Sequence, residues 1–156
     1  PKVDKAAKEG NRNAVVFPRA RVEGAPYDFS FSGLKSAVLN HINHAHMMGE
    51  EINVPDLMAS FQYAVVDVLT SHAVEAAKNL GYDKVAIAGG VASNSALRAE
   101  MKEACEKAGL KFYYPSPIFC TDNAAMIGVA GYYEYINGTR SGLDLNAVPN
   151  LKLGER

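Results

Sequence analysis

The sequence is poor in cysteine. Only Cys105 and Cys120 occur among its 156 residues, and they form no CxxC pair. This scarcity excludes a disulfide-stabilised scaffold and is typical of a reducing compartment, so we expect a cytoplasmic protein. Both cysteines are expected to be small, partly buried hydrophobic side chains.

Long apolar runs and a sizeable net charge are missing as well. No hydrophobic stretch is long enough to span a bilayer, and the first residues do not resemble a signal peptide, so no membrane association is expected. The formal net charge is −1, which excludes a global basic field. Lysine and arginine are nevertheless concentrated in residues 1–35 and absent from residues 36–77. The basic region could touch a phosphate backbone, although a solvated surface is the more common outcome.

Several catalytic motifs are absent. There is no GxSxG nucleophile motif, no Walker-type loop and no GxGxxG. His41, His44 and His46 invite a metal hypothesis, but on a helix only His41 and His44 share a face, and the i, i+4 spacing of helical zinc ligands is missing. We therefore expect surface or partly buried helix histidines. Lys35, one turn into the same helix, is expected to be solvated.

The order of patterned segments predicts an α/β fold. With 48% hydrophobic and 21% charged residues, the chain has the composition of one ordinary globular domain. Apolar periodicity, proline at a first turn and glycines at helix ends define the elements. We expect helices at 1–9, 33–48 (with Ser32 as N-cap), 55–80, 95–108 and 122–136, strands at 27–31, 84–88 and 110–115, and an irregular tail from 137.

Two polar loops are expected to meet at one edge of the sheet. Strands 84–88 and 110–115 are separated by one helix, which predicts a parallel pair with a right-handed crossover. Ligands of such sheets bind beyond the carboxyl ends of the strands. AGGVASN (88–94) follows the first strand and PSPIFCTDN (115–123) follows the second. Both loops are therefore expected at the ligand-binding edge.

AGGVASN supports two interpretations. Gly89 and Gly90 allow a close backbone approach, the next helix offers free N–H groups, and Asn94 offers an amide to a ribose or a base, as a nucleotide loop requires. A tight turn followed by a capping Asn or Ser explains the same residues. The stretch alone does not decide between them.

Asp122 also has two interpretations. It stands at an expected helix start, where N-capping is the common role of a lone aspartate. The alternative is a carboxylate that binds a metal or orients a ligand at the mouth of the sheet. One carboxylate cannot make a metal site, so further ligands would have to come from elsewhere.

Three segments together resemble a known family. FSFSGLKSAV (29–38), AGGVASNSALR (88–98) and PIFCTDNAAMIGVAGY (117–132) are similar, in order and spacing, to the tRNA N6-adenosine threonylcarbamoyltransferases, formerly called O-sialoglycoprotein endopeptidases. The resemblance implies the actin, sugar-kinase and heat-shock ATPase superfamily, whose halves carry ribonuclease-H-like cores. Residues 1–156 resemble its carboxy-terminal half, a single domain with added helices and an irregular tail at 137–156. A start at Pro1 rather than Met also suggests a fragment.

The resemblance implies a chemistry and its site. The family transfers a threonylcarbamoyl group from threonylcarbamoyl-adenylate to N6 of adenosine 37 in tRNAs that read ANN codons. Asn94, beside Gly89 and Gly90, matches the residue that contacts the adenosine of the nucleotide, and Asp122 matches the metal-binding aspartate. Iron or zinc is the implied metal, with magnesium possible, and ATP or threonylcarbamoyl-adenylate is the nucleotide. Implied partners are tRNA, the other subunits of the threonylcarbamoyladenosine-forming complex and the amino-terminal half.

The match also has gaps. The family's other metal ligands, two histidines of an HxxxH motif, lie in the amino-terminal half and are not in this chain; His41 and His44 do not replace them. We therefore expect the isolated chain to fold but neither to bind nucleotide tightly nor to transfer the group. Two other hypotheses are a metalloendopeptidase, which no HExxH supports, and an actin-like assembly surface without catalysis.

Overall fold

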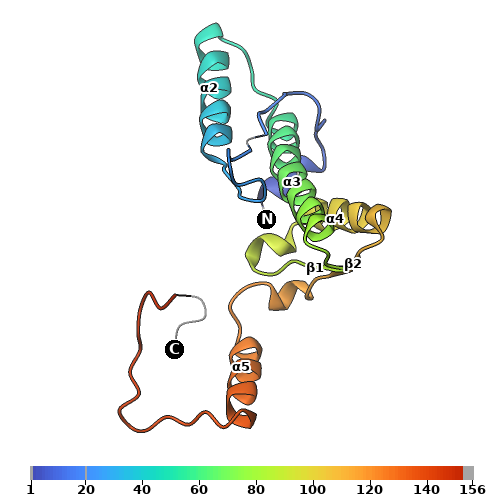
Figure 1. The fold of residues 1–156 in the computed structure, drawn as a ribbon. Helices are drawn as coiled ribbons and strands as arrows, with labels where there is room; N and C mark the ends of the chain where they lie inside the picture. The colour runs from blue at the N-terminus through green and yellow to red at the C-terminus, as the bar shows by residue number, and fades with distance from the viewer. Residues whose placement is uncertain (1, 20, 153–156) are drawn as a thin grey trace. The chain divides into compact units, whose positions relative to one another are not determined.

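The computed structural model describes residues 2–19 and 21–152, and Figure 1 shows their fold. The chain divides into two compact units, Pro1–Thr121 and Asp122–Arg156. The elements of the first unit are α1 (Lys2–Ala7), α2 (Ser32–Met48), α3 (Val54–Asn79), β1 (Lys84–Ala86), the 3₁₀ turn η1 (Gly90–Ser93), α4 (Ser95–Ala108), β2 (Lys111–Tyr113) and the 3₁₀ turn η2 (Pro117–Phe119). No helix among the described residues is long and apolar enough to cross a membrane.

Local signals set the ends of the helices. Asn53 caps α3 by accepting a hydrogen bond from the Asp56 amide at 3.1 Å, and Pro55 stands in the first turn. Gly109 closes α4 in the left-handed conformation at φ 70°. The sequence placed helix 95–108 correctly. It was wrong by one residue at α2, where Ser32 is the first helical residue and Phe31 the cap.

The strand expected at residues 27–31 does not form. Tyr27 lies in a turn, in which the Asp28 amide donates to the Ala25 carbonyl at 3.1 Å. Phe29 instead stacks on the buried His72 ring of α3, with the two ring centroids 5.5 Å apart. The alternation of aromatic residues therefore reflects packing against a helix, because no neighbouring strand among the described residues pairs with this segment.

The described sheet consists of two parallel strands. Lys84 pairs with Lys111, Val85 with Phe112 and Ala86 with Tyr113, so the expected parallel pair and its helical crossover are confirmed. The strands are shorter than the expected 84–88 and 110–115. This part of the chain is thus a mixed α/β structure with a small parallel sheet.

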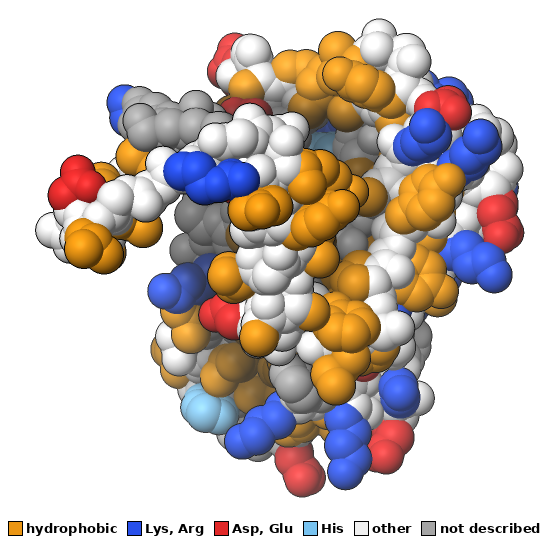
Figure 2. Space-filling view, turned by 90° about the horizontal axis from the view of Figure 1, so that it is seen from below, with side chains coloured by type: hydrophobic (Ala, Val, Ile, Leu, Met, Phe, Trp, Pro, Cys, Tyr) orange, Lys and Arg blue, Asp and Glu red, His pale blue; other side chains and the backbone are white. Residues whose placement is uncertain are grey.

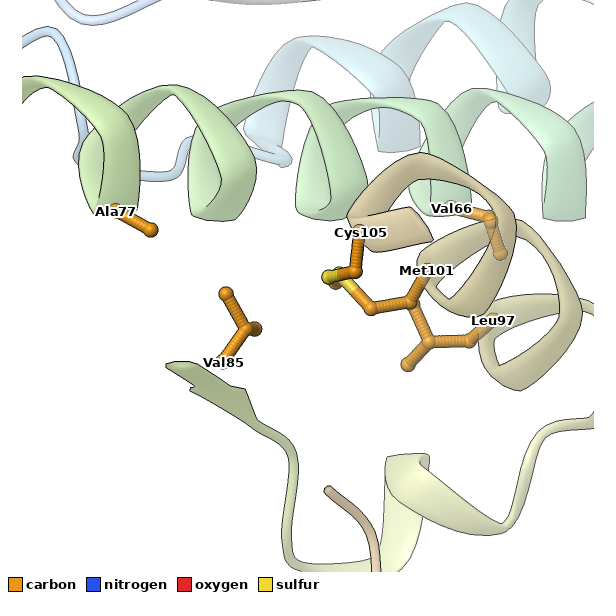
Figure 3. Packing of buried hydrophobic residues seen from close by; sticks show 6 residues of the cluster. All are labelled: Val66, Ala77, Val85, Leu97, Met101 and Cys105. Carbon is orange, nitrogen blue, oxygen red and sulfur yellow. The ribbon is translucent and has the colours of Figure 1, made fainter. Parts of the chain in front are cut away.

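Figure 3 shows the core over that sheet. Its buried side chains come from α3, β1 and α4 and point toward one another; they are Val66, Ala77, Val85, Leu97, Met101 and Cys105. Met101 is only 1% exposed and Cys105 is fully buried, so Cys105 behaves as the hydrophobic side chain that was expected. A two-stranded sheet is marginal by itself, and the two packed helices supply most of its burial.

A second core joins α2 and α3. It comprises Phe17, Leu34, Leu57 and Ala64, with Val15, Phe31, Val38, Ile42 and Phe61 packed around them. Residues 11–19 run along α3, where the Val15 amide donates to the Ser60 hydroxyl at 3.1 Å. The first unit therefore forms around one long central helix (Figure 1).

The second unit contains α5 (Ala124–Ile136), and its described residues 137–152 form neither helix nor strand, as expected for the tail. The α5 side chains are mostly hydrophobic and exposed; among them are Met126, Ile127, Val129, Tyr132, Tyr133 and Ile136. Exposed hydrophobic side chains also stand out between charged ones on the face drawn in Figure 2.

Candidate functional site

The loop after β1 has the backbone that its two glycines suggest. Gly89 adopts φ 81°, a left-handed conformation that favours glycine. Gly90 opens η1 with an ordinary backbone, and a Cβ built on it would meet nothing within 4 Å. Gly89 is therefore required by the turn, whereas the absence of a side chain at Gly90 leaves open space beside the loop.

Asn94 has two structural partners. Its Oδ1 accepts a hydrogen bond from the Leu97 amide at 2.9 Å, which caps α4. Its Nδ2 donates to Gln62 Oε1 of α3 at 2.7 Å. The capping interpretation is thus confirmed for Asn94. Contact with a nucleotide remains a prediction for Gly89, Gly90 and Asn94.

A cavity of about 690 Å³ lies along this loop. Residues of η1, its flanks and α1 line it, together with Thr121; the set is Asp4, Lys5, Lys8, Gly90, Val91, Ser93, Asn94 and Thr121. One side of the cavity is therefore formed by the small residues of the loop, and the other carries Asp4 together with Lys5 and Lys8, which are both exposed.

The Asp4 carboxylate holds α1 against the start of α4. The Ser95 hydroxyl donates to Asp4 at 2.9 Å, and the Ser95 amide donates to the same carboxylate at 3.4 Å. Sequence reasoning did not place Asp4, Lys5 or Lys8 at this loop. They precede it by more than eighty residues, and no local pattern reports such a long-range contact.

Asp122 does not cap α5. The cap is Asn123, whose side chain accepts a hydrogen bond from the Met126 amide at 3.0 Å. Asp122 is exposed, and within the described residues its carboxylate has no hydrogen-bond or ion-pair partner. The N-cap interpretation of Asp122 is therefore wrong.

The described residues do not assemble a metal site. No group of three or more His, Cys, Asp or Glu side chains among them could hold an ion. His41 is half-buried with its ring nearly perpendicular to that of Phe17, and His44 and His46 are exposed, as expected. Asp122 thus offers a single carboxylate, and any metal would need ligands beyond this set. Lys35 is exposed, also as expected.

Three arginines of the basic amino-terminal region pair with acidic side chains. Arg12 contacts Glu100 at 2.6 Å, Arg19 contacts Asp67 at 3.0 Å and Arg21 contacts Glu75 at 3.5 Å. Their carboxylates lie on α3 and α4, so these ion pairs fasten the irregular segment to the helices. Because the pairs are exposed, each contributes little to stability.

The chain resembles part of a larger solved structure. The likeness is to the crystal structure of HypF from T. kodakarensis, with a TM-score of 0.64 and 23% sequence identity. It covers 88% of this chain but 17% of that one. At this identity the likeness concerns the fold alone.

Sequence comparison gives a closer relation. The proteins called tRNA N6-adenosine threonylcarbamoyltransferase from Clostridium botulinum (strain Hall) and Clostridium perfringens (strain ATCC 13124) are each 58% identical over all 156 residues. The chain spans about half the length of these relatives, 46% in each case. The sequence model of the same family matches residues 1–129. This chain therefore belongs to the tRNA N6-adenosine threonylcarbamoyltransferase family.

Proposed function

We propose that this chain forms part of an enzyme that transfers a threonylcarbamoyl group from threonylcarbamoyl-adenylate to N6 of adenosine 37 in ANN-decoding tRNA. In that reaction the N6 amine forms a bond to the carbamoyl carbon and loses a proton, and the bond from this carbon to an oxygen of the adenylate phosphate breaks, so AMP leaves. Membership of a transferase family across the whole chain is the observation that carries the proposal.

We further propose that the loop at 89–94 is one wall of the nucleotide site. The open space at Gly90 and the adjoining cavity accommodate a flat ligand beside the backbone. Lys5 and Lys8 line the same cavity and supply positive charge suited to the phosphate of ATP or threonylcarbamoyl-adenylate. Asn94 would contact the adenosine while its Oδ1 continues to cap α4.

Asp122 is proposed as one metal ligand only. Its carboxylate is exposed and has no capping role, which supports the assignment, but the described residues provide no second and third ligand. The remaining ligands would be the HxxxH histidines of an amino-terminal half. A bound iron, zinc or magnesium ion would act as a Lewis acid. The histidines of α2 do not take part in this proposal.

The architecture proposed is the carboxy-terminal, ribonuclease-H-like domain of an actin-like protein, with α2 as an added helix and residues 1–156 as one domain. An uncovered face of the sheet supports this proposal, because an amino-terminal half could pack there. The exposed residues of that face are Lys84, Ala86, Lys111 and Tyr113, while Val85 is buried on the other face. Its proposed partners are the amino-terminal half, tRNA and the other subunits of a cytoplasmic threonylcarbamoyladenosine-forming complex.

A chimera tests this function directly. This chain replaces the matching segment of the Clostridium botulinum relative, and transfer of radiolabelled threonine into an ANN-decoding tRNA is measured with purified partner subunits. We expect activity within about tenfold of the relative, since 58% identity preserves a fold and its site. A chimera that folds and binds ATP but modifies no tRNA contradicts the proposal.

Gly90→Val in the chimera tests the nucleotide wall. The Cβ of the added side chain meets no neighbouring atom within 4 Å, so the folded state should be retained while the cavity is partly filled. We expect a loss of ATP affinity of about tenfold or more by calorimetry, with Lys102→Ala on exposed α4 surface as the unaffected control. Unchanged ATP affinity would place the nucleotide elsewhere.

The isolated chain is expected to show no micromolar ATP binding. Binding of a partner protein by the isolated chain, without nucleotide binding, would favour the assembly-surface hypothesis.

A further inference from the structure

Arg98, in the first turn of α4, contacts both loops at the carboxyl edge of the sheet. Its Nε donates to the Ala92 carbonyl in η1. Its Nη2 donates to the Pro115 carbonyl at 2.9 Å and to Cys120 Sγ at 3.2 Å. The guanidinium also lies over the Tyr114 ring, 4.7 Å from the centroid. One side chain therefore joins the segment after β1 to the segment after β2.

The partners of Arg98 are the inner parts of those loops. Ala92 is 1% exposed and Cys120 is 3% exposed, so both lie beneath the surface of the turns that contain them. Cys120 Sγ is also within 3.6 Å of the Ser116 carbonyl, which closes the second turn on itself. Without Arg98, the buried Ala92 carbonyl would lose this donor, at a cost in free energy.

The arginine has no acidic partner in the described part of the chain. Arg12 pairs with the Glu100 carboxylate of the same helix, whereas Arg98 meets carbonyl oxygens, a thiol and a ring. A guanidinium carries its donors on three nitrogens in a planar fork, whereas the three donors of a lysine ammonium all lie on one nitrogen and cannot span acceptors this far apart in the same way. The arrangement thus requires arginine rather than a positive charge alone.

We propose that Arg98 is a positioning residue that fixes the segments 90–94 and 115–120 relative to each other and so holds the proposed nucleotide wall in its binding shape. Arg98 does not line the cavity beside Gly90 and Asn94, and it acts on that cavity through the Ala92 backbone. The link to nucleotide binding rests on the proposed function, whereas the clamp between the two segments does not.

Thiol labelling of the chain itself tests the clamp. Cys120 lies under Arg98, and Cys105 lies in the core, where burial raises the pKa of its thiol, so the two cysteines report local and global opening. In Arg98→Ala we expect Cys120 to react at least about tenfold faster with a small disulfide reagent, with Cys105 unchanged. Lys102→Ala, which removes a cation from the exposed side of the same helix, should leave both rates unchanged.

Arg98→Lys keeps the test decisive should the alanine variant unfold. We expect it to speed the labelling of Cys120 selectively, by at least about threefold over wild type, because one ammonium nitrogen cannot replace two separate donor nitrogens. If the labelling rates of both cysteines rise in parallel in the lysine variant, the role of Arg98 is merely structural and the clamp is overturned. Wild-type labelling rates at Cys120 in both variants would overturn it too.

The chimera then tests the consequence for function. Arg98→Lys should raise KM and the Kd for ATP by about tenfold and change kcat by less than about threefold, since a shifted loop weakens binding more than chemistry. Selective exposure of Cys120 with unchanged Kd would keep the clamp but remove its role in the nucleotide wall. A chimera without any transfer activity would reject the proposed function, while the labelling result would still judge the clamp.

Discussion

The side chains of Asn94 and Gln62 are joined by a hydrogen bond of 2.7 Å, in which the Asn94 amide nitrogen is the donor. It connects the loop after β1 with α3, across thirty-two positions of the sequence. Because the other end of the Asn94 amide caps α4, this single side chain fixes the loop to two helices. Asn94, which is proposed to contact a nucleotide, therefore also has a structural role.

The two roles of Asn94 can be separated by substitution. Asn94→Ser retains an N-cap oxygen and should lower stability by less than about 1 kcal/mol, whereas Asn94→Ala removes the cap and should cost about 1 kcal/mol more. Both remove the amide, so both should weaken ATP binding by the chimera to a similar extent, about tenfold. Urea unfolding and calorimetry measure the two effects. If the Asn94→Ser chimera binds ATP as tightly as the chimera with Asn94, the role of Asn94 is structural only.

Gly10 is expected to tolerate no side chain. A Cβ there would lie 2.1 Å from the Pro55 carbonyl oxygen and 2.7 Å from the Asp56 nitrogen, and these backbone atoms belong to the first turn of α3. Gly10→Ala should therefore lower the free energy of unfolding by about 1–3 kcal/mol, the cost of overpacking. The matched control is Gly33→Ala in α2, where a Cβ meets nothing within 4 Å.

The control should be neutral or slightly stabilising, by up to about 0.5 kcal/mol, because alanine favours a helix over glycine. Urea midpoints at unchanged m value measure both variants. Equal midpoints for Gly10→Ala and wild type would show that α1 can move away from α3 without loss. The cavity would then have an adaptable wall, since Lys5 and Lys8 belong to α1 and its end.

The elements with strong local signals were predictable from the sequence. Helix α4 has Asn94 before it and Gly109 after it, and both act as the expected caps. The parallel pairing followed from the strand, helix, strand order and needs no knowledge of distant residues. These features are decided within residues 84–113, a short continuous stretch of sequence, so they can be predicted from local patterns.

What depends on distant partners was not predictable. The aromatic run at 27–31 has the alternation of a strand, yet Phe29 stacks on His72 of α3 and the segment stays irregular. The cavity beside Gly90 needs α1, whose contact with Ser95 through Asp4 spans ninety-one positions. Aspartate and asparagine are both good N-caps, so the sequence could not tell whether Asp122 or Asn123 would cap α5. The backbone geometry selects Asn123.

The pair of Glu103 and Lys107 on α4 gives a prediction for pH. Hydrogen bonding and charge from Lys107 lower the pKa of Glu103, and Glu103 raises the pKa of Lys107 in return. The stability from Glu103 is therefore present above its unfolded pKa and is lost as the pH falls through its folded pKa. The stability from Lys107 is present below its unfolded pKa and is lost as the pH rises through the raised pKa of Lys107 in the folded state.

Lys107→Met should bring the pKa of Glu103 back toward its ordinary value in an NMR titration of the side-chain carboxyl. The stability difference from wild type should be small, because the pair is exposed, and should disappear at acid pH and in high salt. Glu106→Gln is the matched control, because Glu106 lies on the same helix but pairs with Lys102; it should leave the pKa of Glu103 unchanged. A depressed pKa of Glu103 that persists without Lys107 would assign the effect to another cation.

Asp122 and Asn123 give neighbouring substitutions with opposite expectations. In the chimera, Asp122→Asn keeps the shape of the side chain and removes the charge, so the proposed carboxylate ligand is lost and metal content should fall at least about tenfold by elemental analysis. Asn123→Ala removes the cap that accepts from the Met126 amide, so it should cost about 1 kcal/mol of stability and keep the metal. Undiminished metal in Asp122→Asn would reject the assignment. Equal metal loss in both variants would instead trace the effect to the start of α5, because a frayed first turn misplaces Asp122 without removing its carboxylate.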